Sequence, residues 1–162
     1  RLKDIKQMKK EGLITNNDFL LGIRAAMKFQ DSLLKQLSET YGLTLIEANV
    51  ITFLHNNPGK DTAADITELR MLSKGNVSQA VESLIQKGFL KRIPDLHDRR
   101  RIHLALLPAS HSITADVDTL MDEYRGYLFQ GFSKEEFACY QILSKRLMEN
   151  AKNAMKGRST HE

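Results

Sequence analysis

The stretch SKGNVSQAVESLIQKG, residues 73–88, carries the pattern that decides the fold. Ser73 is a typical helix N-cap residue, and the final glycine suits the end of a helix. Val77, Val81 and Leu84 recur at helical spacing, which predicts one buried face. The remaining face holds mostly short or polar side chains, at Lys74, Asn76, Ser78, Gln79 and Glu82. Such a helix can be held by its apolar face while its polar face stays open to a partner or to solvent.

A second short helix is expected directly before this one. The run TAAD, residues 62–65, resembles a capping box with Asp in place of the usual Glu. Ile66 and Leu69 supply apolar positions, so we expect a helix over residues 62–70. Two helices at 62–70 and 73–87, joined by a tight turn, form a helix-turn-helix.

A change of hydrophobic period follows the second helix. Residues 89–93 and 102–106 are short runs of bulky or branched side chains, which predicts two strands. Residues 94–101 would form a charged hairpin loop between them. Because this hairpin directly follows a helix-turn-helix, we expect a winged helix-turn-helix domain over residues 43–107.

Helical patterns flank this domain on both sides. Apolar residues recur at helical spacing over 17–42, and the run TLIE at 44–47 is a capping box that starts a further helix. Beyond the hairpin, Pro108 suits the first turn of a helix over 109–130. The run SKEE at 133–136 is another capping box, and it starts a last helix that reaches residue 155.

The predicted fold is mostly α-helical, with a small two- or three-stranded β-wing, and falls in the α+β class. Residues 17–42 and 108–156 form a helical layer beside the winged helix. Residues 1–16 are expected to be a basic arm or a short helix, and residues 157–162 a polar tail.

Charge is concentrated rather than spread along the chain. The 162 residues carry a net charge of only +4. Six basic and two acidic residues fall within 87–101, which favours a polyanionic partner. The single cysteine, Cys139, excludes a disulfide framework and any metal site built on a cysteine pair within the chain. No apolar run approaches the length of a membrane helix, so we expect a cytoplasmic protein.

The polar residue types on the 73–87 helix and the hairpin suit DNA. Asn and Gln side chains can read adenine, Lys and Ser suit phosphate or guanine, and an arginine on a hairpin can enter a narrow minor groove. Asp98 is expected to pair with Arg100 and fix the shape of the loop. The alternative is a solvated surface. The predicted DNA contacts are Lys74, Asn76, Ser78, Gln79, Arg92, Arg99, Arg100 and Arg101.

Several motifs in this order resemble the MarR-type winged-helix regulators, over roughly residues 18–155. They are LT at 43–44, NPG at 57–59, the helix 73–84, QKGFLKR at 86–92 and DLHDRR at 95–100. The resemblance implies an obligate homodimer on pseudo-palindromic DNA, with recognition helices in major grooves and wings in minor grooves. It also implies relief of binding by small, often aromatic or anionic, effectors. We expect a transcriptional regulator, and favour repression over activation.

The resemblance also assigns residues, and it has departures. Asp98 and Arg100 match the paired Asp and Arg of the wing, and Arg99 matches the residue at its tip. Pro108 follows two leucines where the family usually has Leu-Thr, so the hydroxyl N-cap of the next helix is missing. Peroxide-sensing members carry a cysteine in the first helical region, which this chain lacks. We interpret Cys139 as a small buried or interfacial residue, with a reactive thiol as the alternative.

The helical layer predicts two further surfaces. Its apolar stripes exceed what a monomer of this size can cover, so we expect a dimer interface, with packing inside one chain as the alternative. The interface candidates are Phe19, Leu20, Ile23, Phe129, Phe132, Phe137, Tyr140 and Leu147. An effector pocket is expected where the layer meets the winged helix, with a plain core as the alternative. The pocket candidates are Met27, Phe29, Phe53, His55 and Tyr124.

Other classes of function find less support in the sequence. His55, His97 and His103 fit no closed metal site, so we expect neither a metal nor a cofactor. Phosphate loops, nucleophile elbows and paired His-carboxylate motifs are missing, so we do not expect an enzyme. The alternative function is a winged-helix protein-interaction module that has lost DNA binding.

Overall fold

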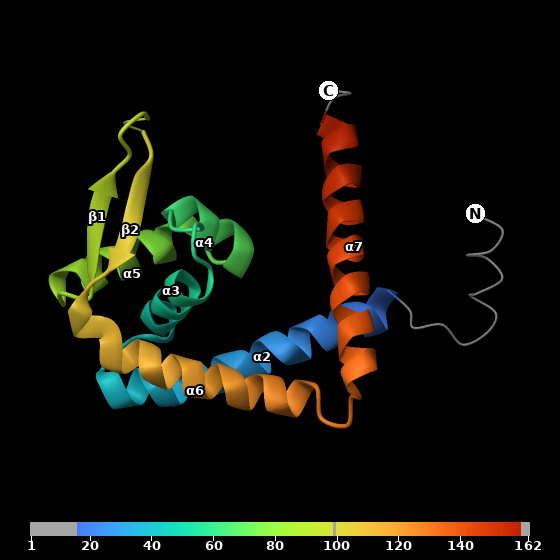
Figure 1. Ribbon diagram of the computed structural model, residues 1–162. Helices are drawn as coiled ribbons and strands as arrows, with labels where there is room; N and C mark the ends of the chain where they lie inside the picture. The colour runs from blue at the N-terminus through green and yellow to red at the C-terminus, as the bar shows by residue number, and fades with distance from the viewer. Residues whose placement is uncertain (1–15, 99, 160–162) are drawn as a thin grey trace, which may run out of the picture. The chain divides into compact units, whose positions relative to one another are not determined.

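The computed structural model describes residues 16–98 and 100–159 (Figure 1). Most of the expected N-terminal arm, the wing residue Arg99 and the last three residues of the tail lie outside these ranges. The elements are α2 (Asn16–Tyr41), α3 (Leu45–Asn56), α4 (Ala63–Arg70), α5 (Lys74–Gln86), β1 (Leu90–Pro94), β2 (Ile102–Leu106), the 3-10 turn η1 (Pro108–Ser110), α6 (His111–Leu128) and α7 (Lys134–Ser159). This order and the mostly helical class confirm the predicted fold.

The chain divides into two compact units, and the boundary along the chain falls between Tyr124 and Arg125. The first unit contains the winged helix together with α2 and most of α6. The second contains the end of α6 and α7. The predicted site residues of the winged helix therefore all belong to the first unit.

Three capping boxes start helices where the sequence predicts them. The Thr44 hydroxyl accepts a hydrogen bond from the Glu47 amide at 3.2 Å, and the Glu47 carboxylate accepts one from the Thr44 amide at 2.7 Å. Thr62 with Asp65, and Ser133 with Glu136, make the same reciprocal pairs. These pairs satisfy amides that a helix start leaves without partners.

The two strands form an antiparallel hairpin. Leu90 pairs with Leu106 at its base, and Pro94 pairs with Ile102 near the loop. A single isolated bridge joins Thr62, the N-cap residue of α4, to His103 beside this two-stranded sheet. The amide of Leu104 donates to the Asp61 carbonyl at 2.7 Å, which fastens the hairpin to the helix-turn-helix.

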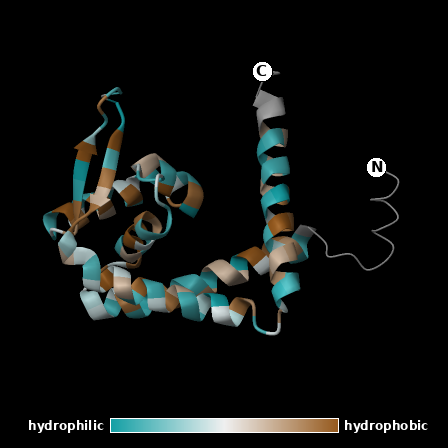
Figure 2. Ribbon diagram, in the orientation of Figure 1, coloured by the Kyte–Doolittle hydropathy of each residue, from teal (hydrophilic) through white to brown (hydrophobic). Residues whose placement is uncertain are grey.

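One hydrophobic core holds the first unit together. Its fully buried side chains come from α2 to α6 and include Leu34, Ile51, Ile66, Leu84 and Val117. The predicted inward face of α5 is confirmed, because Val77, Val81 and Leu84 are at most 3% exposed. Figure 2 shows hydrophobic and hydrophilic segments interspersed along α2 and α6, as expected for amphipathic helices.

The segment between β2 and α6 reflects the missing hydroxyl N-cap before Pro108. Leu107 stands at the N-cap without a side-chain hydrogen bond, and Pro108 starts a short 3-10 turn instead of α-helix. The hydroxyl of buried Ser110 donates to the Leu107 carbonyl at 2.7 Å. Helix α6 therefore begins only at His111, two residues later than the expected start at 109.

Candidate nucleic-acid interface

The exposed face of α5 contains the predicted base-reading residues. Lys74, Asn76, Ser78 and Gln79 are all exposed, whereas the valines of the same helix are buried. The Ser73 hydroxyl caps the helix by accepting from the Asn76 amide at 3.2 Å. The sequence thus separates the two faces of α5 as predicted, and it leaves short polar side chains open to a groove.

Arg92 links this helix to the hairpin. Its guanidinium donates to the Glu82 carboxylate at 2.7 Å, and both side chains are about half exposed. The pair joins β1 to α5 and offsets the acidic charge on the exposed face of the helix. Arg92 therefore has a partner inside the chain, which the sequence did not indicate, and its contact with DNA stays a prediction.

Lys87, another member of the basic run, is also engaged within the chain. Its ammonium lies 2.9 and 3.0 Å from the two oxygens of Glu47, which is only 2% exposed. Burial by itself would raise the pKa of Glu47, but hydrogen bonds from Ser83, Thr44 and Lys87 outweigh it and lower the pKa. This pair holds the start of α3 against the end of α5.

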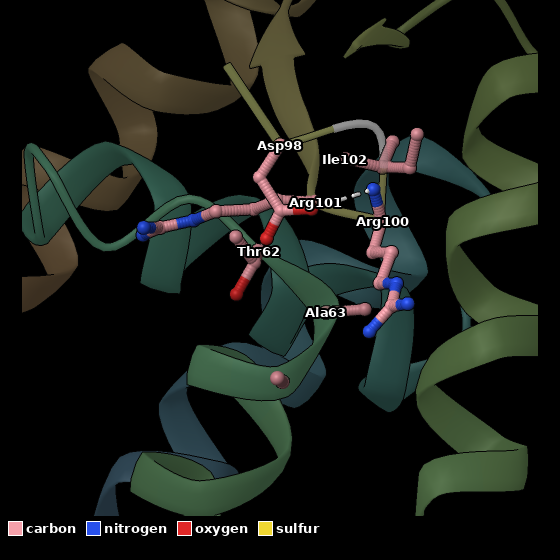
Figure 3. A pocket seen from close by; sticks show the side chains of 7 residues that line it. Thr62, Ala63, Asp98, Arg100, Arg101 and Ile102 are labelled. Atoms are coloured by element: carbon pink, nitrogen blue, oxygen red, sulfur yellow. Dashed lines mark hydrogen bonds between the residues drawn. The ribbon is translucent and has the colours of Figure 1, made fainter. Parts of the chain in front are cut away.

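Other basic residues of the run 87–101 lie on the hairpin, where they are available to a polyanion. Among the described residues, no ion pair engages the side chains of Lys91, Arg100 or Arg101. Figure 3 shows the guanidinium groups of Arg100 and Arg101 spread in different directions beside Thr62. They border a hollow of about 460 Å³ between the hairpin and the first turn of α4.

The loop of the wing is shaped by two aspartates. Asp98 Oδ1 accepts from the backbone amide of Arg100 at 3.0 Å, so Asp98 fixes the loop through the backbone and not through the expected guanidinium. Asp95 Oδ1 accepts from the amides of His97 and Asp98 at 2.7 and 2.8 Å. Asp95 therefore organises the loop at least as much as Asp98 does, a role that sequence reasoning missed.

His103 is a second residue whose place the sequence did not reveal. Its Nδ1 lies 2.7 Å from Asp61 Oδ1, and its Nε2 lies 2.9 Å from Asp95 Oδ2. Hydrogen bonds with Asp95 and with Asp61 raise the pKa of the imidazole. The hydrogen bond with His103 is also the main cause that lowers the pKa of Asp95.

A cavity of about 210 Å³ lies among α2, α3 and the turn after α4. Its lining includes the apolar side chains of Met27, Ile46 and Leu72 and one cation, Arg70. The Arg70 guanidinium donates to the amide oxygens of Gln30, at 2.9 Å, and Asn49. Its buried Nε has no hydrogen-bond partner among the described residues. Sequence reasoning did not single out Arg70.

The predicted pocket residues do not gather around this cavity. Met27 lines it, whereas Phe29 stacks on Tyr124 with ring centroids 5.6 Å apart. Phe53 belongs to the core and is 3% exposed. His55 Nε2 lies 2.7 Å from Asp118 Oδ1. The structure thus places one of the five candidates beside the cavity.

The interface candidates fall in both units. On α2, Phe19, Leu20 and Ile23 are 43–60% exposed. In the second unit, Phe129 makes edge contacts with its aromatic neighbours, while Leu147 is half exposed. The neighbours of Phe129 are Phe132, Phe137 and Tyr140.

Cys139 is exposed on α7, which contradicts a buried place within the chain. An interfacial place and a reactive thiol both remain compatible with that exposure.

Within the part of the chain that the structure describes, no group of three or more His, Cys, Asp or Glu side chains is arranged to hold a metal ion. None of the described helices is long and apolar enough to cross a membrane.

Comparison with known proteins gives a family match for the central part of the chain. A model of the MarR family matches residues 41–101, which span α3 to the wing. An uncharacterized HTH-type transcriptional regulator, YsmB of Bacillus subtilis (strain 168), is 24% identical over 94 residues, 58% of this chain. The match spans 64% of that relative, just under two thirds of its length.

Solved structures share the fold over most of the chain. The transcriptional regulator PA3341 superposes with a TM-score of 0.70 at 21% identity, covering 83% of this chain and 97% of that one. A MarR regulator from Methanosarcina mazei Go1 gives 0.67 at 17% identity, with 85% and 99% covered. BpsR of Bordetella bronchiseptica, whose DNA binding is regulated by 6-hydroxynicotinic acid, gives 0.56 at 17%, with 78% and 95% covered. These matches show that the chain has the fold of MarR-type winged-helix proteins, and that the part from α3 to the wing loop matches the model of the MarR family.

Proposed function

We propose that the chain represses transcription as a homodimer on a pseudo-palindromic operator. The exposed polar face of α5 carries this proposal, because it stands beside a hairpin loop whose arginines Arg100 and Arg101 form no ion pair within 4 Å among the described residues. In this arrangement α5 enters a major groove and the wing enters the adjacent minor groove.

The two elements would contribute different kinds of contact. On α5, Asn76 and Gln79 are suited to adenine, and Lys74 and Ser78 to phosphate or guanine. On the wing, Arg100 and Arg101, with Arg99 from the sequence, would be attracted to the negative potential of a narrow minor groove. We expect α5 to set base preference and the wing to add affinity.

A second copy of the chain is the proposed partner of the exposed apolar face on α2. Phe19, Leu20 and Ile23 would lose water-exposed area there, which favours association. Two-fold symmetry would then place the two recognition helices one DNA turn apart, about 34 Å.

The Arg70 cavity is the proposed effector site. A partly buried guanidinium hydrogen-bonded only to neutral amides, with an unpartnered Nε, favours a small organic anion. Asp31 also lines the cavity, so the ligand must present an apolar or hydrogen-bonding edge on that side. Met71 and Leu72 line it too, directly before the cap of α5, so occupancy would shift the recognition helix.

A fluorescence-anisotropy titration on operator DNA, selected from a random pool and repeated over a salt series, tests the proposal. We expect log affinity to fall linearly with log salt, and light scattering to show a dimer at micromolar concentration. A stable monomer, or a lack of salt-dependent binding, would contradict the proposal and favour the interaction module. A reporter gene behind the same operator would separate repression from activation.

The effector site has its own control. Arg70→Met should abolish relief of DNA binding by small aromatic carboxylates while leaving binding itself intact. Relief that persists in this variant would remove Arg70 from the proposed site.

A further inference from the structure

One histidine joins three segments of the winged helix. The ring of His103 lies on β2, where its side chain is 26% exposed. Its Nδ1 contacts Asp61, the residue before the N-cap of α4, at 2.7 Å. Its Nε2 contacts Asp95, the first residue of the wing loop, at 2.9 Å. The ring is thus a cross-link between the wing and the helix-turn-helix.

The number of protons on this ring follows from the geometry. A carboxylate only accepts hydrogen bonds, and a neutral imidazole has a single N–H to donate. Because both ring nitrogens lie within 2.9 Å of a carboxylate oxygen, both contacts are satisfied only by the imidazolium. Loss of one proton would set a ring lone pair against a carboxylate oxygen and weaken one of the two contacts.

The contact with Asp95 reaches the tip of the wing. While Asp95 Oδ2 faces the ring, its Oδ1 accepts from the backbone amides of His97 and Asp98. The contact with Asp61 reaches the sheet, since the Asp61 carbonyl accepts from the Leu104 amide at 2.7 Å. A change at the ring therefore acts on the loop that carries the arginines.

We propose that His103, held as an imidazolium between Asp61 and Asp95, positions the wing and makes DNA affinity depend on one proton. The proposal rests on the proposed function, in which the wing contacts DNA. Affinity would be full while the ring carries both protons. It would fall as the pH rises through the pKa of the ring, which the two carboxylates place above its ordinary value.

The other charged groups nearby do not replace this effect. On β1, the strand partner of His103 is the apolar Ile93. In the first turn of α4, Asp65 accepts a hydrogen bond from the Thr62 hydroxyl, which lowers the pKa of Asp65. The charges of Lys60 and Arg101 lower it further. On α3, Glu47 is paired with Lys87, and His55 is paired with Asp118. Neither pair involves the ring of His103. Asp61 and Asp95 are thus the carboxylates that contact the ring.

The first test follows the ring itself in the free protein. Nitrogen-detected NMR should show His103 protonated on both nitrogens at pH 6.5, with a titration midpoint above that pH. Asp61→Asn and Asp95→Asn should each lower the midpoint. The amide signals of His97 and Asp98 should move with the same midpoint. A ring that is neutral at pH 6.5, or loop amides that ignore its titration, would overturn the proposal.

The second test measures DNA affinity between pH 6 and 9, where Lys and Arg stay charged. The wild type should lose up to about tenfold in affinity per pH unit above the His103 midpoint. His103→Gln should bind weakly at every pH, and His103→Arg, which keeps a charge, should bind better than His103→Gln with little pH dependence. His97→Gln, a change on the exposed loop, should keep the wild-type profile and serves as the control.

Two outcomes separate this inference from the proposed function. Circular dichroism would first show that His103→Gln is folded. If this variant kept the wild-type pH profile, the proposed clamp, His103 held between Asp61 and Asp95, would be overturned, while DNA binding would stand. If neither the wild type nor any variant binds DNA at any pH, the proposed function fails, and the NMR titration of the ring and loop amides still decides whether His103 holds the wing loop.

Discussion

Helix α5 and the wing are neighbours in the sequence but are held by different interactions. Helix α5 is placed by its buried apolar face and by its serine cap. The base of the wing is also buried, through Leu90 and Leu104, but nearer its loop the wing is placed by polar contacts, through Arg92 to Glu82 and through His103 to two aspartates. Apolar burial involves no charge that titrates or is screened, whereas exposed or half-exposed ion pairs are screened by salt and depend on the protonation of their members. Helix α5, which we expect to read bases, is thus held mainly by uncharged contacts. The position of the wing loop, which we expect to add affinity, depends more on pH and salt.

The largest effect should come from the anchor of α5. Leu84→Ala removes a fully buried side chain and should lower the free energy of unfolding by about 2–5 kcal/mol. Chemical denaturation would measure it. Leu96→Ala, at a position 94% exposed on the wing loop, is the matched control and should change stability by less than about 0.5 kcal/mol. Equal losses in both variants would erase the contrast between the two regions.

A second prediction separates reading from affinity. Gln79→Ala should alter base preference, at about 1–3 kcal/mol for the matched base. Arg99→Ala, on the wing, should weaken binding to all sequences alike and reduce the salt slope by about one. Selection from a random DNA pool, followed by titration of the winners, distinguishes the two. If neither variant changed affinity or specificity, the docking would be wrong.

The start of α4 provides a smaller effect. Thr62→Ala removes the hydroxyl that accepts from the Asp65 amide, and should cost about 1 kcal/mol in unfolding free energy. Thr62→Ser keeps the hydroxyl and should recover most of that loss. Because Asp61 precedes this cap, the alanine variant should also lower the midpoint of His103. An unchanged midpoint would show that the clamp is independent of the cap.

The smallest effect concerns the link between the two regions. A double-mutant cycle of Glu82→Ala and Arg92→Ala should give a coupling of about 0.2–1 kcal/mol, since the pair is exposed on both sides. Half-molar salt should reduce it further. Coupling well above 1 kcal/mol would mean that the wing and α5 behave as one rigid element, contrary to the comparison above.

The predictable parts of this protein are those with local signals. Capping boxes and apolar periodicity lie within a few residues of each other, so the starts of α3, α4 and α5 and the buried face of α5 could be read directly. The contacts of His103 could not be predicted from the sequence, because Asp61 lies 42 residues before His103 and only the folded hairpin brings them together.

The same reason explains Arg70. Its partners Gln30 and Asn49 lie 40 and 21 residues away, so nothing in the local sequence marks it. Its position in the last turn of an amphipathic helix suggests a solvated arginine. Only the packing of α2 and α3 against that turn shows that its Nε is buried.

The size of the Arg70 cavity sets the concentration range of any response that depends on it. At about 210 Å³ the cavity is smaller than the roughly 300–1,000 Å³ of typical ligand pockets. A ligand confined to it has few atoms, and each atom contributes a limited amount to affinity. Binding would then be weak and quickly reversible. Such a regulator would respond to accumulation of an abundant metabolite and recover as soon as its concentration fell, instead of detecting traces of a rare compound.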